Sequence, residues 1–291
     1  MTITAGEQTT LQAADPGPSM LRLDIRAVSI VWKRELMRYR SDRLRIISSL
    51  VQPVLFLVVL GTGLANLAGR GMPDGVDFRT YIYPGVLAMS VLFTSMFSAG
   101  SIVWDREFGF LREMLVAPVH RWAIVLGKVL GGATVATLQG FVILALAFVA
   151  HVPYNPVLLL TLVGELLLLS FTMTAFGVMM AGRITQMQAF FALNQMSVMP
   201  LFFLSGALYP LNGLPAWLGV LTRLDPLTYM VDPMRNAVFS HLGLSGPVVR
   251  SLSHSVTWNG WPVPIGLSLG IVAVMGGVLL AIGIAEFQKT E

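Results

Sequence analysis

The sequence contains no cysteine and few charged side chains. Lysine, arginine, aspartate and glutamate make up 12% of its 291 residues, whereas a soluble domain has about 25%. The missing cysteines exclude disulfides, thiolate catalysis and cysteine-based metal sites. Because so few charges cannot cover a water-exposed surface, we expect lipid to surround much of the chain.

A phosphate-binding loop is also missing from the sequence. Such a loop requires Gly-x-x-x-x-Gly-Lys-Ser/Thr before a helix, but the chain's one Gly-Lys pair, Gly127-Lys128, is followed by Val129. We therefore expect any ATP hydrolysis to occur on another polypeptide. We also expect no catalytic residue, cofactor or metal in this chain. We interpret Lys128 as a residue that extends its ammonium group to the cytoplasmic interface.

Hydrophobic residues are abundant, at 55% of the chain, and the mean hydropathy is +0.74. About 20 apolar residues are needed to cross the hydrocarbon core of a bilayer, and six segments are long enough. The sequence therefore predicts an all-α integral membrane protein with six transmembrane helices. The expected spans are residues 46–68, 81–103, 124–150, 157–182, 189–209 and 262–285.

The positive charges predict the orientation of these spans. If the N-terminus is cytoplasmic, 14 of the 19 Lys and Arg residues lie on the cytoplasmic side, as the positive-inside rule requires. We therefore expect a multi-pass protein of the cell (cytoplasmic) membrane with both termini in the cytoplasm. Residues 1–20 lack an apolar segment, which predicts a disordered cytoplasmic tail and no cleavable signal peptide. The net charge of +4 favours contact with anionic lipid headgroups, and we expect no nucleic acid partner.

Two further segments are too polar to span the membrane. Residues 21–45 repeat apolar side chains at helical spacing beside a basic face, which predicts an amphipathic interfacial helix, either an anchor alone or an anchor that also contacts a partner. Residues 210–261 contain two short apolar stretches broken by prolines and charges. This pattern favours short external helices that enter the outer leaflet, with an ordinary outer loop as the alternative.

The segment between spans two and three reads WDREFGFLREMLVAPVHRWAIVLGK over residues 104–128. Together with LSGALYPLNGLPAWL at 204–218 and LDPLTYMVDPMR at 224–235, it resembles the membrane subunits of ABC-2 type exporters, which include daunorubicin-resistance permeases. Each motif is loose, but the three follow one another in the order of that family, and the likeness extends over residues 21–288.

The resemblance implies a specific mechanism. The loop would contain a coupling helix that binds a separate ATPase subunit, where ATP and Mg²⁺ are held. The amphipathic helix would be the family's connecting helix, and residues 210–261 its external re-entrant helices. Two permeases, identical or different, would pair with two ATPases to export a lipophilic cargo. The expected coupling residues are Glu107, Phe108, Gly109, Arg112, Glu113, Pro118 and Arg121.

Polar residues within the predicted spans are candidates for a translocation pathway, because burying them in lipid is costly. Glu165 is the clearest, since it lies in a leucine-rich span. It could contact a cationic cargo, pair with a basic group, or be a neutral hydrogen-bonded carboxyl. Gln139, Asn194 and Gln195 could line the pathway or only join helices.

Two other functions are compatible with parts of the sequence. An ion-driven secondary transporter is the main alternative, but it would require several buried ionisable groups or paired broken helices. An intramembrane serine protease could use Ser245, in a Gly-x-Ser-Gly motif, with His254. Both residues belong to one Pro- and Gly-containing external segment, which disfavours the positioned pair that nucleophilic catalysis needs.

Overall fold

The computed structural model describes residues 19–65, 76–209, 211, 215–244, 246, 248–249, 256–258 and 261–290. Within these residues, six helices are long and apolar enough to cross a membrane, which confirms the expected number of spans. They are Arg43–Gly63, Phe78–Glu107, Arg121–Ala145, Pro156–Ala181, Met187–Leu204 and Ile265–Lys289. The expected N-terminal tail lies almost wholly outside the described residues.

Several spans are built from more than one element. The first combines α2 (Arg43–Leu55), the π-helix η1 (Phe56–Leu60) and α3 (Gly61–Gly63). The second combines α5 (Phe78–Ser98) and α6 (Gly100–Glu107). The other spans are α8 (Arg121–Ala145), α9 (Pro156–Ala181), α10 (Met187–Leu204) and α14 (Ile265–Thr290), and η3 (Ala147–Ala150) is a short 3-10 turn after α8.

Local sequence signals explain where individual helices begin. The side chain of Asn155 accepts a hydrogen bond from the Val157 backbone N–H at 2.9 Å, and Pro156 occupies the first helical position of α9. This combination satisfies a free backbone donor and fixes the helical φ angle. In α2, Pro53 lies three residues before the start of the π-helix at Phe56, so the irregularity that a proline causes within a span is absorbed locally.

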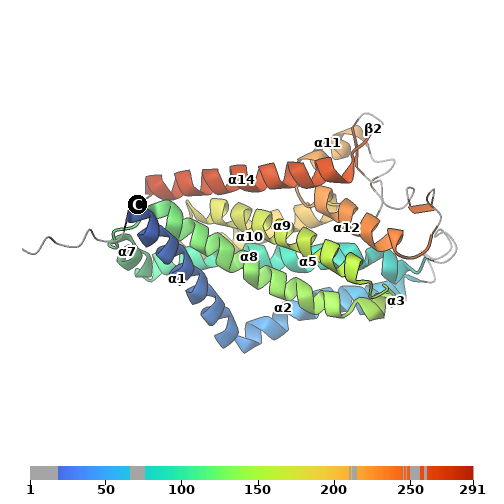
Figure 1. Ribbon diagram of the computed structural model, residues 1–291, viewed down its shortest axis with the longest axis horizontal. Coiled ribbons are helices and arrows are strands. Elements are labelled where there is room, and N and C mark those ends of the chain that lie inside the picture. Colours follow the sequence, from blue (N-terminus) through green and yellow to red (C-terminus); the bar gives the residue numbers. More distant parts are fainter. Residues whose placement is uncertain are drawn as a thin grey trace, which may run out of the picture.

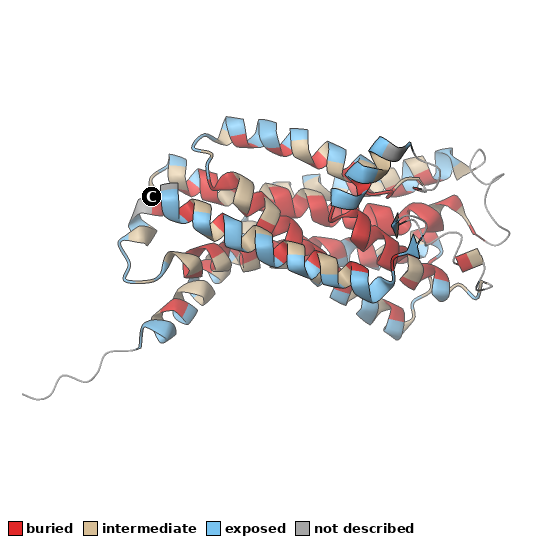
Figure 2. Cartoon of the chain, turned by 90° about the horizontal axis from the view of Figure 1, so that it is seen from above, coloured by how far each residue is buried: buried red, intermediate tan, exposed pale blue. Residues whose placement is uncertain are grey.

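The second span forms the centre of the bundle. In its most apolar window 83% of the residues are buried, compared with 17% in the first and sixth spans and 22% in the fifth. Figure 2 shows the same contrast, because the central helices are red on most sides whereas the outer helices are red on one side only. The outer spans therefore leave apolar faces that require lipid or a protein partner.

The two ends of the bundle differ in structure (Figure 1). One end carries α7 (Phe110–Leu115), the start of α1 (Met20–Ser41) and the end of α14, and we call it the α7 end. The opposite, far end carries α3, α11 (Ala216–Leu224), α12 (Thr228–Ser240) and a short antiparallel pair, β1 (Thr257–Trp258) and β2 (Trp261–Pro262).

Helix α1 packs lengthwise against α8 rather than standing apart from the bundle. A Cβ atom on Gly127 would lie 2.8 Å from the Val31 Cβ, and one on Gly131 would lie 2.6 Å from the Glu35 Cβ. These glycines therefore permit the close approach, as small residues do at helix contacts in membranes. Leu21 and Ile25, from the expected apolar face of α1, remain 64% and 60% exposed.

The segment after the fifth span folds into α11 and α12, and α12 is largely buried. Its Arg235 is fully buried and donates hydrogen bonds to the carbonyl oxygens of Gly206 at 2.8 Å and Ala207 at 3.4 Å. The guanidinium carbon also lies 4.5 Å from the centre of the Tyr81 ring. These contacts fix α12 to the turn after α10 and to α5.

Asp225 lies between α11 and α12 and is only 2% exposed. Its carboxylate oxygens accept hydrogen bonds from the Leu227 N–H at 2.9 Å and the Thr228 hydroxyl at 3.2 Å. Burial raises the pKa of Asp225 to about 8, because removal from water disfavours the charged form more than these two bonds favour it.

We expect this carboxyl to make the protein less stable as the pH rises. The folded state retains a proton on Asp225 that the unfolded chain releases near pH 4, so the stabilisation is complete below about pH 4 and is lost by about pH 8. The slope is at most about 1.4 kcal/mol per pH unit. Thermal unfolding of the wild type and Asp225→Asn at about pH 6 and pH 8 tests this prediction. The melting temperature should fall less between the two pH values in the variant than in the wild type. Equal falls in melting temperature would assign the effect to another group.

Candidate functional site

The loop between the second and third spans projects from the α7 end. Phe108 caps the end of α6, Gly109 adopts a left-handed φ of 81°, and α7 begins at the next residue, Phe110. Leu111 is 1% exposed and anchors α7 to the bundle, whereas Glu113 and Pro118 are exposed. Phe108 and Phe110 are also exposed, at 56% and 50%. The loop thus presents apolar and acidic side chains beside one another on an open surface.

The start of this loop is fixed to the turn between α9 and α10. The Arg106 guanidinium donates hydrogen bonds to the carbonyl oxygens of Ala181 at 3.1 Å, Gly182 at 3.1 Å and Ile184 at 2.6 Å. The Glu107 carboxylate accepts a hydrogen bond from the Met187 backbone N–H at 2.9 Å. It therefore satisfies a free donor at the start of α10 and complements the positive end of that helix.

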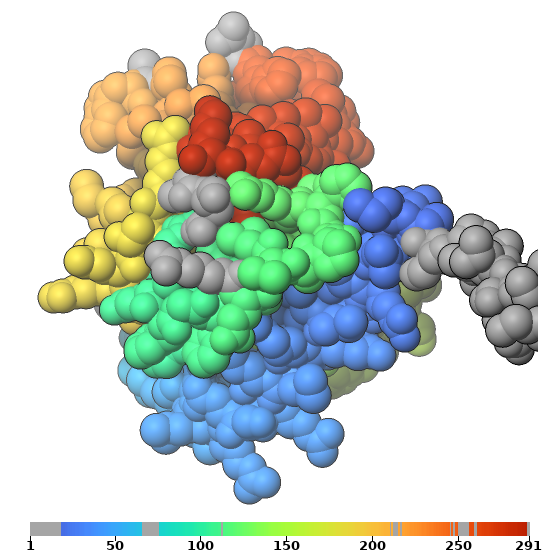
Figure 3. All heavy atoms as spheres, turned by 90° about the vertical axis from the view of Figure 1, so that its left-hand side faces the viewer, coloured from blue at the N-terminus to red at the C-terminus, as the bar shows by residue number. Residues whose placement is uncertain are grey.

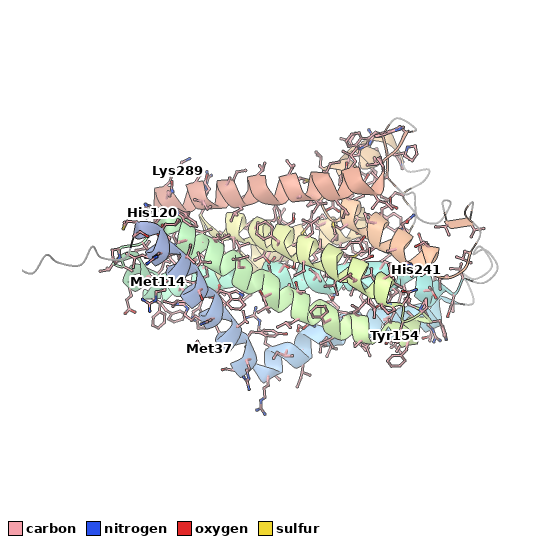
Figure 4. All side chains as sticks on the ribbon, viewed as in Figure 1. Met37, Met114, His120, Tyr154, His241 and Lys289 are labelled. Carbon is pink, nitrogen blue, oxygen red and sulfur yellow. The ribbon has the colours of Figure 1, made fainter. Side chains whose placement is uncertain are left out.

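The end of the loop is fixed to α1 and α14. The Asp24 carboxylate accepts a hydrogen bond from the His120 backbone N–H at 2.9 Å and lies 2.7 Å from the His120 Nδ1. The backbone N–H of His120 is the largest cause that lowers the pKa of Asp24. Arg121 donates a hydrogen bond to the Gln288 carbonyl at 3.0 Å. Figure 4 shows His120 and Lys289 at the same end of the molecule, opposite Tyr154 and His241.

Taken together, these contacts join one short loop to four other helices. Arg106 and Glu107 connect it to α9 and α10, and His120 and Arg121 connect it to α1 and α14. In Figure 3, which looks onto the α7 end, the green atoms of this region lie between the blue N-terminal helix and the red end of α14. A displacement of the loop would therefore act on several spans at once.

A buried charge cluster lies beneath the loop, among α1, α6 and α8. The Lys128 Nζ donates to the Glu35 carboxylate at 2.6 Å, to the Asp105 carboxylate and to the Ser101 hydroxyl at 3.2 Å. Glu35, Asp105 and Lys128 are 5%, 3% and 4% exposed. Arg34 also pairs with Asp105, and its second guanidinium nitrogen lies 3.4 Å from the Met114 sulfur on α7.

The interpretation of Lys128 as an interfacial residue is therefore wrong. Its ammonium group points into the protein, because the two carboxylates compensate its charge there, and extension to the surface would leave both without their shared partner. Sequence reasoning did not identify Glu35 and Asp105 at all. The sequence shows only that Glu35 and Asp105 are acidic and that Lys128 lies in an apolar helix. A single sequence does not reveal that these three residues pack together.

The four candidate pathway residues do not form one cluster. Gln139 is buried in α8, Glu165 in α9 and Asn194 in α10, whereas Gln195 is exposed. Within the described part of the chain, no hydrogen bond joins any two of them. Glu165 Oε2, Gln139 Nε2 and both polar amide atoms of Asn194 are buried without a hydrogen-bond partner among the described residues. Ser245 and His254, the residues of the protease alternative, lie outside the described residues.

A cavity of about 650 Å³ opens between the α1–α2 corner, the second span and α10. Its polar wall includes Arg38, Tyr39, Asp42 and Arg45, and its opposite wall includes the aromatic rings of Phe93, Phe97, Trp104 and Phe191. None of the four candidate pathway residues lines it. Gln139 lies behind its polar wall, however, because the Gln139 Oε1 accepts hydrogen bonds from the hydroxyl groups of Tyr39 at 3.1 Å and Ser49 at 3.3 Å.

Comparison with known proteins identifies related sequences over most of the chain. The profile described as "ABC-2 type transporter" matches residues 26–239. A transport permease named ycf38 from Cyanophora paradoxa is 29% identical over 223 residues, which is 75% of each chain. YbhR of Escherichia coli, named as a multidrug ABC transporter permease, is 28% identical over 65% of this chain but only 49% of its own length. DrrC of Mycobacterium tuberculosis, named as a doxorubicin resistance ABC transporter permease protein, is 25% identical over 86% of this chain and 91% of its own.

Proposed function

Because this chain belongs to the ABC-2 type transporter family, we propose that it is the membrane-spanning permease subunit of an ATP-driven exporter. ATP and Mg²⁺ bind to a separate nucleotide-binding subunit, and the α7 loop receives the motion of that subunit. The permease binds and moves its cargo without altering it chemically.

The observation that carries this proposal is the set of contacts around α7. The loop offers Phe108, Phe110 and Glu113 to a partner, while its two ends are hydrogen-bonded to α1, α9, α10 and α14. A partner that pushed on the exposed residues would tilt these helices together. Among the expected coupling residues, Glu107 and Arg121 act as internal links, whereas Glu113, Phe108 and Pro118 are available to the ATPase.

The distribution of positive charge supports a cytoplasmic α7 end. With that orientation, both termini are cytoplasmic and 14 of the 19 Lys and Arg residues lie on the cytoplasmic side of the cell membrane. The exposed apolar faces of the first and fifth spans, with Val51, Leu55, Val59 and Met196 at least half exposed, suit contact with a second permease, identical or different, as well as lipid. The far-end helices α11 and α12 would then cap the outer end of the pathway.

Lipophilic molecules or lipids fit best as cargo. The cavity between the α1–α2 corner and α10 has one apolar, aromatic wall, and the relatives named for multidrug and doxorubicin transport belong to the same family. An ion-driven transporter is the less favoured alternative, because it would couple its cargo to a set of buried ionisable groups within the spans. In the described spans, Glu165 is the only buried carboxylate far from the α7 end. Its Oε2 atom has no hydrogen-bond partner among the described residues.

If the Glu165 carboxylate contacts the cargo, Glu165→Gln should change which cargo the exporter prefers. Glutamine keeps the size and one oxygen of the side chain but cannot attract a cationic cargo, so resistance to cationic compounds should fall by about tenfold while resistance to neutral compounds is retained. Resistance profiles of cells that express the wild type or the variant at equal membrane levels measure this. An identical profile would make Glu165 a structural residue.

Purification with a partner tests the proposed function. A tagged permease should retain a nucleotide-binding subunit encoded beside it, and candidate lipophilic compounds should stimulate ATP hydrolysis by that complex. A nucleotide-binding subunit that neither binds the permease nor responds to it would contradict the proposal.

A further inference from the structure

The cavity at the α1–α2 corner has two chemically different halves. Arg38, Asp42 and Arg45 supply charge on one side, and Phe93, Phe97 and Phe191 supply an aromatic wall on the other. A cavity with this division matches a molecule that has a charged head and an apolar body. Its volume of about 650 Å³ is large enough for a headgroup and the first part of its chains.

The charge on the polar side is only partly neutralised by the protein. Arg38 shares Asp105 at 3.8 Å and lies 5.4 Å from the centre of the Trp104 ring. The Asp42 carboxylate accepts a hydrogen bond from the Arg45 backbone N–H at 3.0 Å and so caps the start of α2. No hydrogen bond or ion pair holds the Arg45 guanidinium in the described part of the chain, although this residue is half-buried.

One further unused donor lies behind the polar wall. Gln139 is fully buried, and its Nε2 has no hydrogen-bond partner among the described residues, although its Oε1 is held by Tyr39 and Ser49. Gln139 does not line the cavity, so the donors that face an occupant are those of Arg45, and a guanidinium without a hydrogen-bond partner among the described residues favours an acceptor-rich, negatively charged group there.

We propose that this cavity binds a membrane lipid with an anionic headgroup. The phosphate lies against the Arg45 and Arg38 guanidinium groups, which match its geometry with paired N–H donors. The upper acyl chains lie along Phe93, Phe97 and Phe191. The proposal concerns the same cavity that the proposed function uses as its argument for a lipophilic cargo, but the binding needs no nucleotide hydrolysis, so its failure would not contradict coupling of this chain to a separate ATPase.

Native mass spectrometry of the purified full-length chain in detergent tests this proposal. We expect phosphatidylglycerol to remain bound in preference to phosphatidylcholine with the same acyl chains. Arg45→Gln should weaken phosphatidylglycerol binding by about fivefold to tenfold, and Arg45→Lys should restore part of it. Arg43→Gln is the matched control, because Arg43 is exposed on the same turn and does not line the cavity.

The outcomes separate the possible occupants. Equal retention of the two lipids by the wild type would overturn the assignment without any variant, so the proposal stays testable even if Arg45→Gln fails to fold. Equal losses in Arg45→Gln and Arg43→Gln would place the lipid elsewhere. Free glycerol phosphate should not displace the lipid, since it lacks chains for the aromatic wall, and displacement by it would indicate a site for small anions instead.

Discussion

Lys128→Met should lower the free energy of unfolding by about 3–5 kcal/mol, which is the typical effect of removing one partner from a buried ion pair. The side chain is 4% exposed and compensates both Glu35 and Asp105. Without it, Arg34 remains beside Asp105, but Glu35 loses its closest cation, which lies at 2.6 Å, and keeps only the Arg34 contact at 3.8 Å. Methionine has a similar length, so the change in packing is small compared with the change in charge.

Lys33→Met provides the matched control for this prediction. Lys33 is exposed on the same α1 helix that contributes Glu35 to the cluster, and the chemical change is identical. Thermal unfolding of both purified variants, followed by tryptophan fluorescence, should show a large loss of stability for Lys128→Met and almost none for Lys33→Met. Equal melting temperatures would mean that the buried cluster does not hold α1, α6 and α8 together.

Glu113→Lys should reduce compound-stimulated ATP hydrolysis by the assembled complex by at least about tenfold, because like charges brought together at an interface cost several kcal/mol. Glu113 is exposed on α7 and no hydrogen bond ties its carboxylate to another described residue, so the permease itself should fold and insert normally. Glu107→Lys should impair both coupling and stability, since Glu107 also caps α10 through Met187.

Lys289→Glu is the control for the coupling prediction. It changes the charge by the same magnitude, with the opposite sign, at the same end of the molecule, but it lies at the end of α14 rather than on α7. Stimulated hydrolysis should be close to the wild-type rate in this variant. If Glu113→Lys hydrolyses ATP as fast as Lys289→Glu does, α7 is not the element that receives the motion.

Much of this architecture follows from local properties of the sequence. The six spans follow from hydropathy, since each is an apolar run near the length that a bilayer requires. The position of the α7 loop follows from its motif and from Gly109, whose positive φ permits the break between α6 and α7.

The tertiary contacts could not be predicted in the same way. Lys128 pairs with residues 93 and 23 positions away, and nothing in the spacing along one helix identifies such partners. The face of α1 that is buried is the one that packs against Gly127 and Gly131 of α8. The apolar periodicity of α1 does not predict this face, and Leu21 is exposed. The cavity near Arg45 depends on the angle at Asp42, where α1 ends and α2 begins.

Transport by the purified chain in sealed vesicles tests most directly whether it is a conduit driven by another subunit. We expect no translocation of a labelled lipophilic cargo by the permease alone, and translocation once the nucleotide-binding subunit, ATP and Mg²⁺ are supplied. Translocation by the permease without that subunit would contradict this expectation.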